Sequence, residues 1–103
     1  MSELTITELA TAAGEISTMN SLVHTYIYLH GSTRAAIDAL NSALGRHDEL
    51  PRLYEWRDGR RHIPQPVQDQ MVRECLLPVC RDLLNDQITH TDAVDMLTPP
   101  RRY

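Results

Sequence analysis

The sequence predicts an all-α protein that folds as one compact domain over residues 1–103. Two observations predict this fold class. Apolar residues recur at the three- and four-residue spacing of amphipathic helices, and no stretch shows the strict alternation of a β-strand. With 42% of its 103 residues apolar, the chain can build one hydrophobic core and is too short for two.

The N-terminal half predicts three helices. A capping box over residues 5–8 begins a short first helix, which Gly14 ends. The apolar pattern places a second helix at about residues 18–30. Ser32 can cap a third helix that Gly45 ends, and the alanines on its inner face permit close packing.

Asp48 is expected to cap a fourth helix that ends at Gly59. Pro51 is tolerated in it because N–H groups in the first turn of a helix have no intrahelical partner. A fifth helix is expected from about Gln65. Pro78 falls inside its apolar pattern, so this helix must either kink or give way to a new one. One last helical turn, capped by Thr91 and Asp92, is expected to end at Leu97.

The composition excludes several classes of protein. No window approaches the run of about 20 apolar residues that spans a bilayer, and the first residues lack the pattern of a signal peptide, so we expect a soluble, cytoplasmic protein without a membrane partner. Cys75 and Cys80 fall in a segment that predicts buried helix, which favours reduced thiols over disulfides. Their spacing points the two thiols apart, so no metal site is expected. No catalytic arrangement, cofactor or small-molecule ligand is evident, and we expect a protein that is not an enzyme.

The net charge of −4 argues, taken alone, against a nucleic-acid partner, because affinity for DNA depends largely on neutralised phosphates. The distribution of charge is more informative. Between residues 46 and 62, five arginines stand against four acidic residues, a balance of +1 that leaves −5 for the rest of the chain. Every basic residue is arginine, the side chain suited to bidentate contacts with phosphate or guanine.

One segment of the chain has a distinctive pattern. It contains, in order, an aliphatic residue, a tryptophan, a short basic turn with glycine, and an Ile-Pro pair. They are Leu53, Trp56, Gly59, Arg60, Ile63 and Pro64. This segment resembles the end of the recognition helix and the start of the next helix in Cro- and repressor-type phage regulators. Residues 31–40 look like the first helix of the motif. The resemblance covers about residues 18–75 and implies a compact helix-turn-helix domain of about five helices, with a C-terminal helical extension at 76–97 and a loose tail at 98–103.

The resemblance implies that Trp56 pins the inner face of the recognition helix while the arginine turn clamps phosphates. Because Leu40 and Trp56 lie farther apart than in the family, the first motif helix or the turn must be longer here. The groove-facing positions then include Leu50 and Pro51, which can touch only a thymine methyl. Direct reading of bases and phosphate contact fall to six residues, namely Arg52, Tyr54, Glu55, Arg57, Arg60 and Arg61.

The C-terminal helical region is apolar over more than one face, which predicts self-association. The expected dimer interface comprises Met71, Cys75, Val79, Leu83 and Leu84. Packing of these side chains into the core of the single chain is the alternative. A two-fold dimer would read half-sites about one turn of DNA apart, roughly 34–36 Å.

The sequence therefore predicts a transcriptional regulator of the repressor type that binds a palindromic operator in double-stranded DNA as a homodimer. The alternative is a protein-interaction factor on the same scaffold, such as a phage-encoded inhibitor or antirepressor of a host protein. The surface charge separates the two. A continuous positive patch over the arginines supports DNA as partner, whereas a surface broken by Glu49, Glu55 and Asp58 supports a protein.

Overall fold

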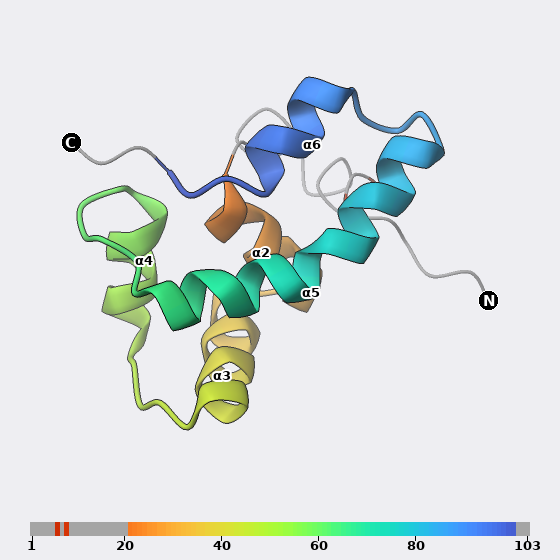
Figure 1. The fold of residues 1–103 in the computed structure, drawn as a ribbon. Coiled ribbons are helices and arrows are strands. Elements are labelled where there is room, and N and C mark those ends of the chain that lie inside the picture. The colour runs from red at the N-terminus through yellow and green to blue at the C-terminus, as the bar shows by residue number, and fades with distance from the viewer. Residues whose placement is uncertain (1–5, 7, 9–20, 101–103) are drawn as a thin grey trace.

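The computed structural model describes Ile6, Glu8 and residues 21–100. Residues 21–100 contain five helices and no strand (Figure 1), which confirms the all-α fold class. The helices are α2 (Leu22–His30), α3 (Thr33–Leu44), α4 (Leu50–Arg57), α5 (Gln65–Leu84) and α6 (His90–Met96). Ile6 and Glu8 are helical, and the rest of the helix predicted near the N-terminus lies outside the described residues.

Helix α2 lies at the centre of the molecule and packs against α3, α4, α5 and α6. Its side chains Leu22, Val23 and Tyr26 are fully buried, because neighbours cover it on most sides. The buried apolar side chains form one cluster, to which all five helices contribute. The cluster holds Ile6, Leu22, Val23, Tyr26, Ala36, Ile37, Leu40, Leu53, Trp56, Ile63, Val67, Met71, Cys75, Val79, Ala93 and Met96.

The predicted glycine stops end their helices as expected. Gly31 ends α2 at φ +89° and Gly45 ends α3 at φ +64°, a conformation that costs glycine little and other residues more. Two predicted caps were wrong. The N-cap of α4 is Glu49 and not Asp48, whose carboxylate pairs with Arg46 instead.

The N-cap of α6 is Thr89 and not Thr91. The Thr89 hydroxyl accepts a hydrogen bond from the Asp92 N–H, and the Asp92 carboxylate accepts one from the Thr89 N–H, so a reciprocal capping box starts the helix two residues earlier than expected.

Helix α5 is a single helix of 20 residues with Pro78 inside it. Proline has no N–H to donate to the carbonyl of Glu74, and its ring crowds that carbonyl. The ribbon accordingly changes direction in its second half (Figure 1). Of the two alternatives, the kink is the one that occurs. Among the described helices, none is long and apolar enough to cross a membrane.

Candidate nucleic-acid interface

Helices α3 and α4 pack against each other and are joined by a five-residue turn, Gly45 to Glu49. Helix α3 continues past Leu40 as far as Leu44. The extra residues that the sequence required between Leu40 and Trp56 are therefore shared between a longer first helix and a longer turn. The result is a helix, a turn and a second helix.

Asn41 holds this turn against α3. Its amide nitrogen donates to the Asp48 carbonyl at 2.8 Å, and its amide oxygen accepts from the Asp48 N–H at 3.0 Å. The Arg46 N–H donates to the Asn41 carbonyl, and the Arg46 guanidinium pairs with the Asp48 carboxylate. Asn41 is thus a positioning residue for the start of α4. The sequence reasoning missed it, although asparagine in the last turns of a helix is a signal, because this side chain competes for nearby backbone groups.

The inner face of α4 is fixed to the core by two side chains. Leu53 and Trp56, three residues apart, are both 0% exposed. Trp56 is the largest fully buried side chain of the described residues, and its Nε1 has no hydrogen-bond partner among them. The interpretation of Trp56 as a core anchor agrees with this burial. The opposite face of α4 is left for solvent or a partner.

The chain leaves α4 through a tight turn at Gly59, which has φ +74°. The Gly59 N–H donates to the Trp56 carbonyl, and the Arg60 N–H donates to the Glu55 carbonyl at 2.9 Å. This pair of bonds is the Schellman motif, which requires a left-handed residue. The chain then returns to the core at Ile63, which is buried. The turn thus presents its arginines outward while both of its ends are anchored.

The arginines of this surface are paired with two carboxylates. Glu55 accepts a hydrogen bond from the Arg61 Nε at 2.9 Å and lies 3.8 Å from the Arg52 Nε. The bond from Arg61 holds the pKa of Glu55 below its usual value.

Asp58 is bound by Arg57 at 3.0 Å and by Arg60 at 3.2 Å. The bond from Arg57 likewise lowers the pKa of this carboxyl. Arg57 also stacks on the neighbouring aromatic ring, with its guanidinium carbon 4.8 Å from the Tyr54 ring centroid. The outer face of α4 is therefore an ordered network of alternating charges.

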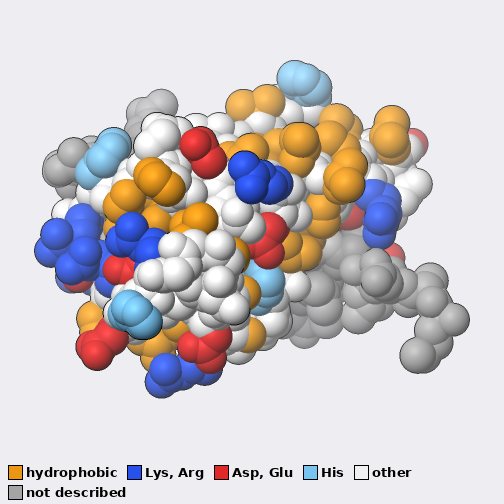
Figure 2. Space-filling model, turned by 60° about the horizontal axis from the view of Figure 1, so that its bottom comes forward, with side chains coloured by type: hydrophobic (Ala, Val, Ile, Leu, Met, Phe, Trp, Pro, Cys, Tyr) orange, Lys and Arg blue, Asp and Glu red, His pale blue; other side chains and the backbone are white. Residues whose placement is uncertain are grey.

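The six predicted DNA-binding residues do come together on α4 and on the turn that follows it. Arg52, Tyr54, Glu55 and Arg57 lie on α4, and Arg60 and Arg61 lie in the turn. Figure 2 shows arginine side chains gathered at the left of the molecule with acidic side chains among them. The surface is not one continuous positive patch, because each arginine between residues 46 and 61 has an acidic neighbour.

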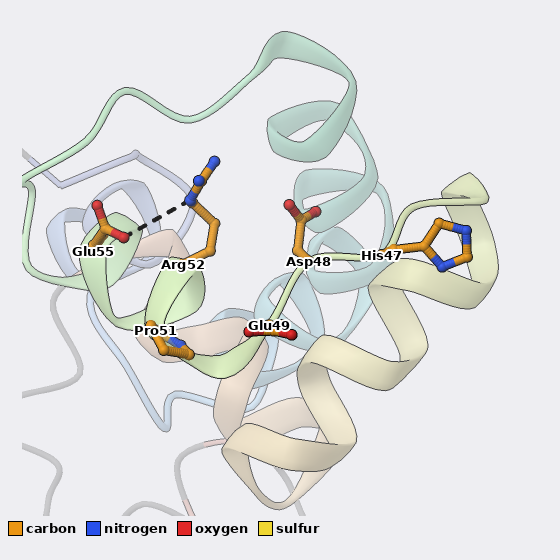
Figure 3. A pocket seen from close by; sticks show the side chains of 6 residues that line it. All are labelled: His47, Asp48, Glu49, Pro51, Arg52 and Glu55. Carbon is orange, nitrogen blue, oxygen red and sulfur yellow. Dashed lines mark ion pairs between the residues drawn. The ribbon is translucent and has the colours of Figure 1, made fainter.

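An open hollow of about 290 Å³ lies beside the start of α4 (Figure 3). Its lining residues are His47, Asp48, Glu49, Pro51, Arg52 and Glu55. The side chains of Arg52 and Asp48 extend to the same side of the chain in this view. The Arg52 Nε is buried and makes no hydrogen bond to the described residues, its ion pair with Glu55 being too long for one. Three carboxylates, those of Asp48, Glu49 and Glu55, therefore line the hollow, and the buried Arg52 Nε is not exposed to it.

The predicted dimer interface needs correction. Met71, Cys75 and Val79 are 0% exposed and belong to the core of the single chain, so they present no surface to a second copy. Leu83 is half-buried against the same core, and only Leu84 is well exposed. The prediction was wrong because α5 is apolar on more than one face, and the sequence alone does not say which of these faces meets the core.

Within the described residues, no group of three or more histidine, cysteine or acidic side chains could hold a metal ion. Burial raises the pKa of the Cys75 thiol to about 12, as expected for a core side chain. No protein-family model, curated protein or solved structure matches this chain.

Proposed function

We propose that this protein is a sequence-specific DNA-binding regulator that inserts α4 into the major groove and acts as a homodimer in the cytoplasm. The observation that carries the proposal is the pinning of α4. Two fully buried side chains hold one face of a short helix, and a helix-turn-helix protein needs that arrangement to present the other face to bases.

The ion pairs of the outer face are compatible with this role. Exposed salt bridges contribute only about 0–1 kcal/mol each, so an arginine can exchange a carboxylate for a phosphate at little cost. Arg60, whose side chain is 62% exposed, is best placed for such an exchange. Arg52 lines the hollow beside α4 and its side chain is 39% exposed, so its terminal guanidinium nitrogens, rather than the buried Nε, are the donors for a base edge or a phosphate.

A titration of labelled duplexes at several salt concentrations tests the proposal. The duplexes are DNA from upstream of the gene, sequences selected from a random pool, and scrambled controls. Arg60→Gln should weaken binding to all duplexes alike and reduce the salt slope by about 0.9. Arg52→Gln should cost about 1–3 kcal/mol on the selected site alone and relax discrimination at one base position in each half-site.

Asp95→Asn controls for net charge, since Asp95 is exposed on α6. It changes the net charge by one unit in the direction opposite to the arginine variants and should leave the salt slope unchanged, because the slope counts phosphate contacts and not net charge. Absence of binding to every duplex even at low salt would refute the proposal.

A protein-interaction factor is the second candidate, and the hollow at the start of α4 favours it. Three carboxylates line this space, and phosphates would meet them first if α4 entered the groove. Their charge suits a cationic side chain of a protein partner.

Glu49→Gln separates the two functions, because Glu49 is exposed and makes no ion pair within the described residues. If DNA is the partner, removing this negative charge should strengthen binding to every duplex. If a cationic protein segment is the partner, the wild type should bind arginine-rich peptides, and the variant should bind them more weakly.

A further inference from the structure

The large hydrophobic side chains that remain exposed in the described residues lie on α5 and α6, at one end of the folded molecule. Leu76, Leu77 and Leu84 of α5 are 44%, 74% and 83% exposed, and Val94 of α6 is 51% exposed. Figure 2 shows hydrophobic side chains grouped at the upper right, on the side where α5 ends in Figure 1, away from the arginines at the left. Exposed leucine on this scale is unusual for a surface that meets only water.

Two of these leucines form a stripe along α5. Leu77 and Leu84 are seven residues apart, so they lie on nearly the same side of the helix, about 10 Å from each other. The buried side chains Met71, Cys75 and Val79 are on the opposite side of α5. The stripe of Leu77 and Leu84 is therefore directed away from the core and contributes little to the fold of the single chain.

We infer that this stripe pairs with the same stripe of a second copy, with the two α5 helices antiparallel about a two-fold axis close to Cys80. This inference rests on the proposed function, because that function requires a homodimer and the stripe is the surface through which the homodimer would form. An isologous interface must be self-complementary. In this arrangement each Leu77 meets Leu84 of the second copy, so each leucine finds an apolar partner.

Charge complementarity supports the antiparallel direction. Arg73 lies one turn before Leu77, and Asp86 lies just after the end of α5; both are exposed. Neither forms an ion pair within the described residues. Antiparallel pairing of Leu77 with Leu84 brings Arg73 of one copy beside Asp86 of the other, twice in each dimer. A parallel arrangement would instead place the two Arg73 side chains side by side.

Cys80 makes the arrangement testable with a residue that the protein already has. It is a free cysteine, partly exposed, between the two leucines along α5. Because the axis lies next to it, the two Cys80 side chains of an antiparallel pair face each other across the interface. At the helix separation of about 8–10 Å that packed helices adopt, their Cβ atoms approach the distance that a disulfide needs. Cys75, the only other cysteine, is fully buried.

The first experiment is sedimentation of the wild type without DNA at tens of micromolar, roughly the range where weak dimers dissociate. We expect twice the chain mass of 11.8 kDa. Leu77→Asp and Leu84→Asp should each return the mass to that of one chain. Ala43→Asp adds the same charge at an exposed position of α3 and should leave the dimer intact.

The second experiment is oxidation with copper phenanthroline followed by denaturing electrophoresis without reductant. The wild type should give a covalent dimer, in which the two Cys80 thiols lose two protons and two electrons to the oxidant and form one disulfide. Cys80→Ser should give none. The double variant Cys80→Ser, Ala43→Cys carries an exposed cysteine on α3 and should also give none.

A wild type that sediments as one chain overturns the inference, and so does a dimer that survives both aspartate variants. A dimer that Cys80 does not cross-link overturns the antiparallel arrangement. Failure of the proposed function gives a different result, because a protein-interaction factor would form the same dimer and the same cross-link but bind no duplex.

Discussion

Trp56→Ala tests how far α4 depends on its buried anchor. Trp56 is 0% exposed, and a tryptophan buries about 150–250 Å². At about 25 cal/mol per Å², removing its contacts forfeits roughly 4–6 kcal/mol, close to the 3–5 kcal/mol typical of large-to-small substitution of an aromatic side chain. A small domain has about 5–15 kcal/mol in total, so we expect most of the stability to be lost.

Urea unfolding followed by far-ultraviolet circular dichroism is the assay, since Trp56 is the only tryptophan and fluorescence disappears with it. Trp56→Phe should lose much less, because it keeps an aromatic ring and the indole Nε1 has no hydrogen bond to the described residues. Tyr54→Ala is the matched control on the outer face of the same helix and should lose less than half as much as Trp56→Ala. Equal unfolding midpoints for wild type and Trp56→Ala would refute the reasoning that Trp56 anchors α4.

Three further predictions concern single side chains. Asn41→Ala should lower the free energy of unfolding by about 1–3 kcal/mol, because it leaves the Asp48 N–H without its acceptor. Hydrogen exchange at the Asp48 amide should then become faster. An unchanged exchange rate would contradict the role of Asn41. Burial and the 2.7 Å hydrogen bond to Glu74 raise the pKa of Tyr26, so above pH 10, roughly the usual tyrosine pKa, Tyr26 ionises in the unfolded chain first and the free energy of unfolding falls. The difference in unfolding free energy between the wild type and Tyr26→Phe should therefore become smaller above this pH. A difference that stays constant up to about pH 11 would contradict this prediction. In mass spectrometry, Cys75 should resist iodoacetamide at pH 8 in the folded protein and react in urea, whereas labelling in both states would show that it is accessible.

The helices of this chain could be predicted from sequence because their end signals are local. Ser32 and Gly45 bound α3 as expected, since each acts through the backbone of its own turn. The N-caps of α4 and α6 were assigned wrongly because several capping residues stand close together, and tertiary contacts choose among them. Asp48 is drawn away from capping by Asn41 and Arg46.

The candidate site was predictable as a group of residues but not as an electrostatic surface. Trp56 and Gly59 are fixed by packing and by backbone conformation, which a residue type signals directly. Which carboxylate each arginine meets depends on side-chain positions across a turn, as with Arg61 and Glu55, six residues apart. The face of α5 that meets the core depends on the placement of α2, whose last residue His30 precedes the first residue of α5, Gln65, by 35 residues, roughly a third of the chain.

Helix α4 and the leucine stripe of α5 lie toward opposite ends of a molecule whose longest dimension is 35 Å (Figure 1). Copies joined at the stripe would hold their α4 helices apart by up to about twice that length. Major grooves on one side of B-DNA recur every 34–36 Å, approximately, so the pair would match grooves two turns apart better than the one-turn spacing expected from sequence. The position of the stripe on the second half of α5 would then set the distance between the two α4 helices of the dimer. Five base pairs inserted between the half-sites, about half a turn, should abolish cooperative binding, and ten should restore it only in part.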